Sequence, residues 1–297
     1  MKHIRRKLYY LLALLFSKLV LVTPYRLSLV IGGSLGAVAY HAASKARRTA
    51  EQNISRAFPD KPVDEVKAIA LEMFENLGKN LFELFSFPKL GRKQIEALVT
   101  IENREAFDAG FKNGKGVLLA SAHCGNWEIL GAALSYSGVP MNCIARNIYI
   151  KQLNDMVVGF RESKNVKVIL RSGRDAAKGI LRSLRGNEAI GILIDQDVDV
   201  QGVYSMFFSR PAWTPSALAT LAIKTGATVV MGLDARLPGD KHKVIITGPV
   251  EMRITADHDD DIVYNTQVLT GMIEKHIRNY PSQWVWMHER WKTQPQK

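Results

Sequence analysis

The chain has 297 residues, of which 47% are hydrophobic, and it carries a formal net charge of +12. This composition excludes a disordered chain and a fibrous repeat, and the length allows one large core. Two cysteines, Cys124 and Cys143, are too few for a disulfide framework or a cysteine-bound zinc site, so a reducing compartment is the simple interpretation.

The positive charge is concentrated at the amino-terminal end. Residues 1–56 contain ten Lys or Arg and one acid, Glu51, whereas residues 57–297 contain thirty basic and twenty-seven acidic side chains. A nearly balanced body lacks the basic surface of a nucleic-acid-binding domain, so we expect no nucleic acid among the partners.

The amino-terminal segment is also the most apolar part of the chain. Its apolar runs, 8–22 and 27–43, are each slightly short of the roughly 20 residues that span a bilayer, and Thr23-Pro24 separates them. The basic clusters on both sides favour a retained membrane anchor against anionic headgroups of the cytoplasmic face, in a re-entrant or interfacial arrangement. A single tilted span and two core helices are the alternatives. We therefore expect an anchor over residues 1–46 and a separate domain over 47–297.

The rest of the chain has the pattern of a soluble α/β domain. Residues 60–87 predict a helix pair that begins near Pro62. After Gly91, β-rich runs alternate with amphipathic stretches, which indicates a largely parallel central sheet with helices on both faces. The expected strands are 116–122, 141–146, 166–170, 189–195, 228–235 and 242–252. The expected helices are 126–136, 150–163, 174–185, 215–225 and 260–279.

The first candidate site is the end of the predicted strand 116–122. His123 follows this strand, Gly125 permits a tight turn, and Asn126 can cap a helix whose first turn contains Glu128. Asp195 ends another predicted strand, and the carboxyl ends of parallel strands meet at one edge of a sheet. These side chains are therefore expected at the same edge.

The residues His123 and Glu128 suit acyl transfer to a hydroxyl. A neutral imidazole can take the proton of an incoming alcohol, while a carboxylate fixes its tautomer and stabilises the imidazolium that forms. The alternative is a structural histidine beside a helix-capping carboxylate. A Cys124 nucleophile is disfavoured because adjacent side chains at a strand end point apart, and no G-x-S-x-G segment supports a serine esterase.

The motif at 121–128, SAHCGNWE, resembles the histidine, four residues, acid motif of the lipid A late acyltransferases. The resemblance covers nearly the whole chain, and one difference is visible: the family commonly has a glycine after its Phe-Phe pair, where this chain has Ser209. Four further segments carry the resemblance: RRTAEQNISRAFPD (47–60), IARNIYIKQLNDMVVGFRESKNVKVI (144–169), AIGILIDQDVDVQGVYSMFFSRPAWTPSALATLAIKTGA (189–227) and YPSQWVWMHERWK (280–292).

The resemblance implies an enzyme that transfers an acyl chain from acyl carrier protein to a hydroxyl of a Kdo-bearing lipid A precursor. It implies catalytic roles for His123 and Glu128, and substrate-binding roles for Asn126, Arg146, Arg161 and Asp195. It also implies an inner-membrane location with the catalytic domain on the cytoplasmic face, among inner-membrane lipids. The open alternatives are another glycolipid acceptor such as a phosphatidylinositol mannoside, an ornithine-type lipid, and a non-catalytic membrane adaptor.

Arginine side chains suit the phosphate or carboxylate groups of such an acceptor. For Arg171 and Arg174, however, a solvated surface position is the better interpretation. Asp195 is expected to orient an arginine or a backbone turn.

Two further patterns are interpreted more plainly. A calcium loop starting at Asp197 would need a carboxylate at position 208, which is Phe208, so we expect no metal and no organic cofactor. Trp284, Trp286 and Trp291 suit either the bilayer interface or an acyl groove on the one hand, or packing of the carboxyl-terminal segment on the other.

Overall fold

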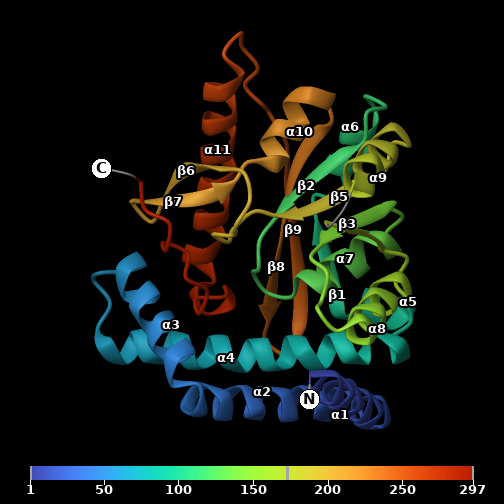
Figure 1. Cartoon of the computed structure of the whole chain (residues 1–297), viewed down its shortest axis with the longest axis vertical. Helices are drawn as coiled ribbons and strands as arrows, with labels where there is room; N and C mark the ends of the chain where they lie inside the picture. Colours follow the sequence, from blue (N-terminus) through green and yellow to red (C-terminus); the bar gives the residue numbers. More distant parts are fainter. Residues whose placement is uncertain (1, 172–173, 296–297) are drawn as a thin grey trace.

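The computed structural model describes residues 2–171 and 174–295. Its centre is a seven-stranded sheet with the order β1-β9-β8-β2-β5-β3-β4 (Figure 1). Neighbouring strands run parallel except β8 and β9, which are antiparallel, so the expectation of a largely parallel sheet is confirmed. The strands are β1 (Val99–Glu102), β2 (Val117–Ser121), β3 (Met141–Ala145), β4 (Lys167–Leu170), β5 (Ala189–Leu193), β8 (Thr228–Leu237) and β9 (Lys241–Val250).

Helices cover both faces of the sheet, as expected. One face carries α9 (Arg174–Arg185), α10 (Ala217–Thr225) and α11 (His258–Asn279), and the other carries α6 (Glu105–Phe111), α7 (Trp127–Tyr136) and α8 (Lys151–Glu162), with α5 (Arg92–Leu98) beside α7. Each face has its own cluster of buried apolar side chains, because central strands such as β2 are buried throughout. The sheet therefore has the continuous apolar strands of a fold that is covered on both sides.

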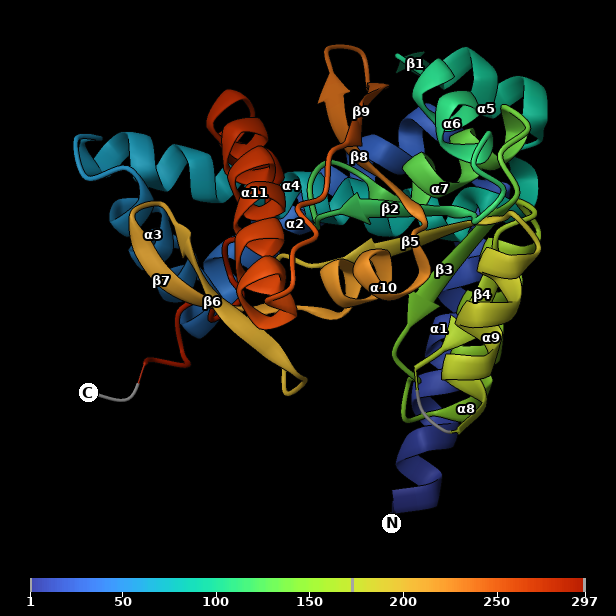
Figure 2. The same cartoon turned by 90° about the horizontal axis from the view of Figure 1, so that it is seen from above.

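The sequence predictions missed several features, among them the short helices α5 and α6. Residues 60–87 form one helix, α4 (Val63–Ser86), followed by a short 3-10 turn, η1 (Phe87–Lys89), so the expected helix pair is wrong. The edge strand β1 has only four residues, too few to show an alternating pattern. A separate antiparallel hairpin, β6 (Gly202–Phe207) and β7 (Arg210–Pro215), packs against α11 away from the main sheet (Figure 2).

The hairpin turn explains the departure at Ser209. Phe208 and Ser209 have φ of 49° and 57°, in the left-handed region that glycine enters most easily. The backbone N–H of Phe208 donates to Glu274 Oε2 at 2.6 Å, and the aromatic side chain is buried. Ser209 therefore adopts the backbone conformation that a glycine would adopt more easily at this position of the turn.

The amino-terminal helices form a layer beneath α4. Helices α1 (Lys2–Val22) and α2 (Tyr25–Ala42) lie under α4, and α3 (Ser44–Ala57) bends sharply away from α2 and crosses α4 near its start (Figure 1). Gly36 and Gly78 allow α2 to approach α4 closely, because a Cβ at either position would overlap the backbone of the facing helix. Helix α4 in turn supports the carboxyl end of β2, since Asn80 Nδ2 donates to Gly125 O at 2.6 Å.

Within the described residues, no single helix has both the length and the apolar character to cross a bilayer. Helices α2 and α3 meet these requirements only as a pair, bent by 92°. The division into an anchor over 1–46 and a domain over 47–297 stays a prediction.

Candidate active site

The loop after β2 is held in a fixed conformation from three sides. Gly125 has φ of 54°, and a Cβ there would overlap Asp234, so the expected tight turn needs glycine. Gly125 N donates to Gln283 O at 2.8 Å, and Asn126 N donates to Asp234 Oδ2 at 2.6 Å. Cys124 forms a β-bridge with Trp284. This loop therefore places His123 firmly at the carboxyl edge of the sheet.

Asn126 is the N-cap of α7, as predicted. Its Oδ1 accepts the backbone N–H groups of Glu128 and Ile129 at 3.0 and 3.1 Å, and its Nδ2 donates to Glu83 at 2.6 Å. Asn126 is only 1% exposed, and both polar atoms of its side chain are already used in these hydrogen bonds. Its placement supports a positioning role rather than the predicted contact with substrate.

The partner of His123 is Asp195. His123 Nδ1 lies 2.9 Å from Asp195 Oδ1, and the His123 backbone N–H donates to Asp195 Oδ2 at 2.9 Å. Trp284 Nε1 adds a third contact to Asp195, at 2.7 Å. Of the two expected roles, Asp195 does hold the backbone of the loop, through the His123 N–H, and no arginine binds it among the described hydrogen bonds. Its carboxylate also orients the histidine ring, which was not predicted.

The pair has a defined protonation pattern. Burial alone would raise the pKa of Asp195, but the charge and hydrogen bonds of His123 and the Trp284 N–H outweigh it and lower that pKa to about 2. An ionised carboxylate can only accept hydrogen bonds. When the His123 ring is neutral, its proton therefore lies on Nδ1, which faces Asp195. Nε2 is then a free base, with no hydrogen bond from any described protein group.

Glu128 has a different partner from the one expected. Its carboxylate forms a bidentate ion pair with Arg161: Nε donates to Oε2 at 2.9 Å, and Nη2 donates to Oε1 at 2.6 Å. Among the described hydrogen bonds, none joins Glu128 to His123. The expectation that Glu128 fixes the tautomer of His123 is therefore corrected, because Asp195 occupies that position on the ring. Burial would lower the pKa of Arg161, but its hydrogen bonds to Glu128 and the charge of that carboxylate outweigh burial and raise it.

His123, Glu128 and Arg161 share a cavity of about 520 Å³ with mostly apolar walls. Trp127 forms part of the wall and packs edge-on against the His123 ring at a centroid distance of 4.8 Å. Its apolar walls come from β2, β3, β4, β5, α7, α8, α9 and α10: Leu119, Leu130, Met141, Ile144, Val157, Val158, Leu170, Ile180, Ile192 and Leu221. A cavity with this lining suits a hydrocarbon chain with its reactive end at His123.

Two arginines lie where the cavity reaches the surface. Arg146, after β3, and Arg171, after β4, are exposed and line the cavity, as does Ile148, which is 41% exposed. This confirms that Arg146 lies near the predicted site, and it places Arg171 there too. Arg174 begins α9, but its side chain lies outside the described part of the structure.

The two cysteines do not act as nucleophiles in this arrangement. Burial raises the pKa of Cys124 far above its usual range and that of Cys143 to about 11, so both are neutral thiols. Across the described residues, no group of His, Cys, Asp and Glu side chains could hold a metal ion.

The tryptophan-rich segment packs against the body of the protein. Trp284 and Trp286 are 1% and 0% exposed, and Trp291 is 7% exposed. The segment contains a 3-10 turn, η2 (Pro281–Gln283), that holds Gly125. Of the two interpretations, packing is confirmed, and a position at the bilayer interface or in the acyl groove is wrong.

A buried polar network under the loop was missed by the sequence analysis. Glu83 of α4 accepts hydrogen bonds from Arg236, His242, Tyr25 and Asn126 at 2.6 to 3.1 Å. A weak signal exists, because the polar residues Asn76, Asn80 and Glu83 recur at helical spacing in an otherwise apolar face. The network connects α4 to β8, β9 and the start of α7.

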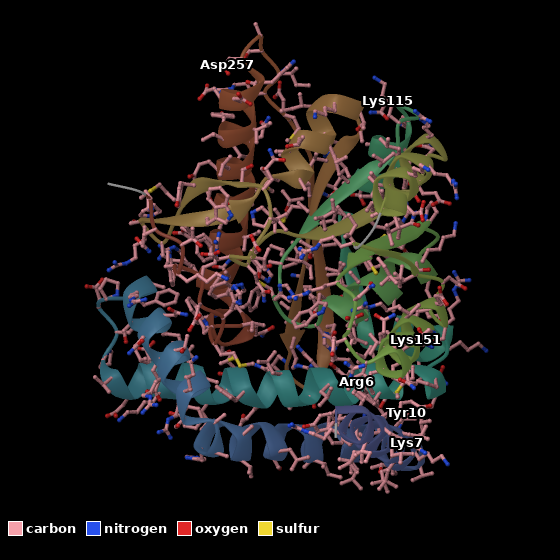
Figure 3. The ribbon with its side chains drawn as sticks, viewed as in Figure 1. Arg6, Lys7, Tyr10, Lys115, Lys151 and Asp257 are labelled. Atoms are coloured by element: carbon pink, nitrogen blue, oxygen red, sulfur yellow. The ribbon has the colours of Figure 1, made fainter. Side chains whose placement is uncertain are left out.

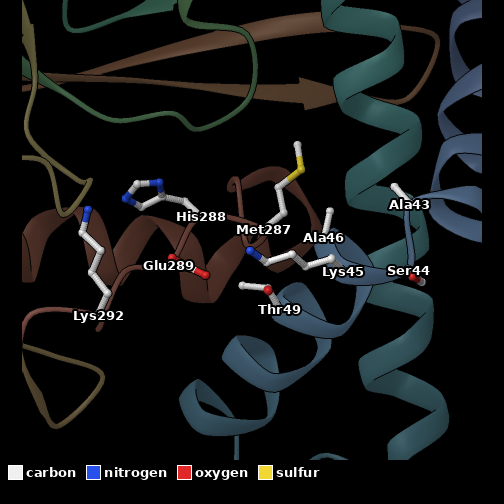
Figure 4. Close-up of a pocket in the computed structure, with 9 residues that line it drawn as sticks. All are labelled: Ala43, Ser44, Lys45, Ala46, Thr49, Met287, His288, Glu289 and Lys292. Atoms are coloured by element: carbon white, nitrogen blue, oxygen red, sulfur yellow. The ribbon is translucent and has the colours of Figure 1, made fainter.

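A second cleft, of about 630 Å³, lies between the start of α3 and the carboxyl-terminal segment (Figure 4). Although it is larger, it is a weaker candidate for the chemistry. Its histidine, His288, has Nε2 3.1 Å from Asp197 O, and burial lowers the pKa of that ring. Lys45 and Lys292 also line it, with Glu289 opposing them in charge. Only the first cavity combines a carboxylate-bound imidazole with an apolar chamber in the described structure.

An imidazole that is oriented by a carboxylate at the end of an apolar cavity can act as a general base toward a hydroxyl, which acyl transfer requires. Comparison with known families agrees. Residues 1–293 match the model of the bacterial lipid A biosynthesis acyltransferases. The chain belongs to this family, and it is an acyltransferase of glycolipid biosynthesis.

The chain is also similar to individual acyltransferases over most of their length. It is 25% identical to the lipid A biosynthesis palmitoleoyltransferase of Escherichia coli, over 92% of this chain and 87% of the relative. It is 22% identical to the lipid A biosynthesis lauroyltransferase of the same organism, over 94% and 89%. It is 24% identical to a phosphatidylinositol mannoside acyltransferase of Mycolicibacterium smegmatis, over 81% and 78%.

Proposed function

We propose that the protein transfers a fatty acyl chain from acyl carrier protein to a hydroxyl of a Kdo-bearing lipid A precursor. The observation that carries the proposal is the His123–Asp195 pair, whose free Nε2 lies at an apolar cavity of about 520 Å³. The cavity accommodates the acyl chain with its thioester carbonyl near the imidazole.

The proposed reaction needs no covalent enzyme intermediate. His123 Nε2 takes the proton of the acceptor hydroxyl as its oxygen attacks the thioester carbonyl carbon, and Asp195 stabilises the resulting imidazolium. When the tetrahedral intermediate collapses, the carbon–sulfur bond breaks and the imidazolium returns the proton to the leaving thiolate. The products are an acylated lipid and the free carrier thiol, and the enzyme is restored.

The other site residues take supporting roles in this proposal. Glu128 and Arg161 connect α7 to α8 across the cavity, and both are largely buried, with side-chain exposures of 11% and 20%. Arg146 is exposed and, in the described structure, unpaired by a carboxylate, so it is available to an anionic group of the acceptor.

A purified-enzyme assay tests the proposal directly. We expect wild-type protein to transfer a radiolabelled acyl group from acyl carrier protein to a Kdo-lipid A precursor. Phosphatidylinositol mannoside and an ornithine-type lipid should be offered in parallel, because the mycobacterial relative is as similar as the lipid A enzymes are. Transfer to one of these lipids and not to the lipid A precursor would reject the acceptor while keeping the reaction.

We further propose that α1 and α2 lie in the surface of the inner membrane, with the catalytic domain on the cytoplasmic side. These helices form one outer layer of the molecule, and eleven of their large apolar side chains are 37–63% exposed. Figure 3 shows Arg6 on the side of α1 toward α8, where it contacts the ring of Tyr149, and Lys7 on the outer side. An apolar face with basic residues suits an anionic lipid interface. The eleven residues are Leu8, Tyr9, Leu11, Leu12, Leu15, Leu19, Leu27, Val30, Ile31, Leu35 and Val38.

The double variant Leu12→Glu/Leu15→Glu tests this placement. We expect it to lose most of its binding to vesicles that contain anionic phospholipid, because two charges replace apolar side chains that are 53% and 56% exposed. The control is Val63→Glu/Met206→Glu, which changes apolar residues outside the layer that are 67% and 48% exposed. Sedimentation with vesicles measures the effect, and unchanged binding of the Leu12/Leu15 variant would contradict the proposal.

A further inference from the structure

Helix α9 presents a stripe of positive charge to solvent. Lys178, Arg182 and Arg185 follow one another at spacings of four and three residues, so they share one face of the helix, and all three are exposed. None of the ion pairs among the described residues includes Lys178, Arg182 or Arg185, so these three cations have no carboxylate partner there.

This charge is a local feature. Residues 171–185 contain five basic residues and one acid, Asp175, whereas the rest of 57–297 has one more acidic than basic side chain. A patch of this kind in an otherwise balanced domain focuses a positive field at one place on the surface.

The opposite face of the same helix lines the cavity of the candidate site. Ala176 and Ile180 contribute to the cavity wall, and Leu184 is 2% exposed. Arg171, directly before α9, is exposed and lines the cavity as well. The basic stripe therefore adjoins the place where the cavity reaches the surface, at Arg171 and Ile148.

We propose that the stripe Lys178, Arg182 and Arg185 docks the acidic face of the acyl carrier protein, so that the thioester enters the cavity past Arg171. This inference rests on the proposed donor. A protein partner fits better than a lipid surface, because α8 separates α9 from the apolar layer of α1 (Figure 1). The stripe is polar, apart from Leu181 at its side, which is 38% exposed.

The test is the triple variant Lys178→Glu/Arg182→Glu/Arg185→Glu, assayed with two donors of the same chain length. With acyl carrier protein as donor, we expect KM to rise roughly ten- to hundred-fold at low salt, with kcat little changed, because charge reversal removes electrostatic steering. With an acyl-pantetheine thioester, which has no protein to dock, both constants should equal those of the wild type. The control variant Arg210→Glu/Lys224→Glu/Lys275→Glu makes the same change in net charge at exposed positions of β7, α10 and α11 that form no ion pair with any described residue. It should leave the constants for both donors unchanged.

Each result separates docking from the proposed reaction. An unchanged KM for the carrier in the α9 variant would overturn the docking surface while leaving the reaction intact. An equal rise with both donors would place the defect in the cavity and also overturn it. Loss of vesicle binding by the α9 variant, with its carrier KM unchanged, would assign the stripe to the membrane. Failure of the wild type with the carrier, but activity with acyl-pantetheine, would reject the carrier as donor and the docking surface with it.

Discussion

The variant His123→Ala should lose roughly 10²- to 10⁴-fold in kcat, the usual contribution of a general base. The variant removes Nε2, the base that faces the cavity, and leaves the fold in place because His123 is partly exposed. An assay of acyl transfer at saturating substrate measures the loss, and circular dichroism establishes that the variant is folded. His258→Ala, on an exposed turn of α11, is the matched control and should keep full activity.

The same assay distinguishes the two carboxylates near His123. Asp195→Asn should cost about as much as His123→Ala, because an amide in this place can donate to Nδ1 and so leave the proton on Nε2. Glu128→Gln should cost less, since Glu128 is bound to Arg161 and not to the ring. If Glu128→Gln proved as damaging as His123→Ala while Asp195→Asn stayed active, the assignment of Asp195 as the orienting group would have to be given up.

The sequence predicted the position of the site better than its pairings. The strand that runs into His123, the turn at Gly125 and the cap at Asn126 are local features, and all were found in the structure. The partner of His123 lies 72 residues away along the chain, at the end of the neighbouring strand β5, so no local spacing identifies it. The five-residue spacing of His123 and Glu128 drew attention to the wrong carboxylate for that role.

The same limit explains what was missed in the fold. Long strands with continuous apolar runs and helices with a clear apolar face were predicted within a few residues, because their pattern is repeated along the segment. Helix α4 was predicted as a pair, whereas the structure has one helix that is continuous through its buried polar residues. These residues, Asn76, Asn80 and Glu83, bind groups 43 to 206 residues away in the chain, and only the folded structure brings those groups together.

Glu83→Ala should lower the free energy of unfolding by about 3 to 5 kcal/mol, as expected when one member of a buried ion pair is removed. Arg236 and His242 would keep their positive charges in the protein interior with too few acceptors, since the Glu83 carboxylate binds both at 2.6 to 3.1 Å. Urea denaturation in mild detergent measures the change. Glu102→Ala, which breaks the exposed ion pair with Lys243, is the control and should cost at most about 1 kcal/mol.

The pH dependence of stability provides an independent check of this network. Burial alone would lower the pKa of His242, but Asp234 and Glu83 outweigh it and raise that pKa to about 9, above the roughly 6.5 of an unperturbed histidine. The folded state therefore holds the proton more tightly than the unfolded chain does. This contribution is complete below pH 6.5 and is lost as the pH rises through 9. We expect the stability of the wild type to fall over this range and that of His242→Gln to fall less, because glutamine does not titrate. Parallel profiles for the two proteins would mean that His242 is not the protonated partner of Glu83 and Asp234.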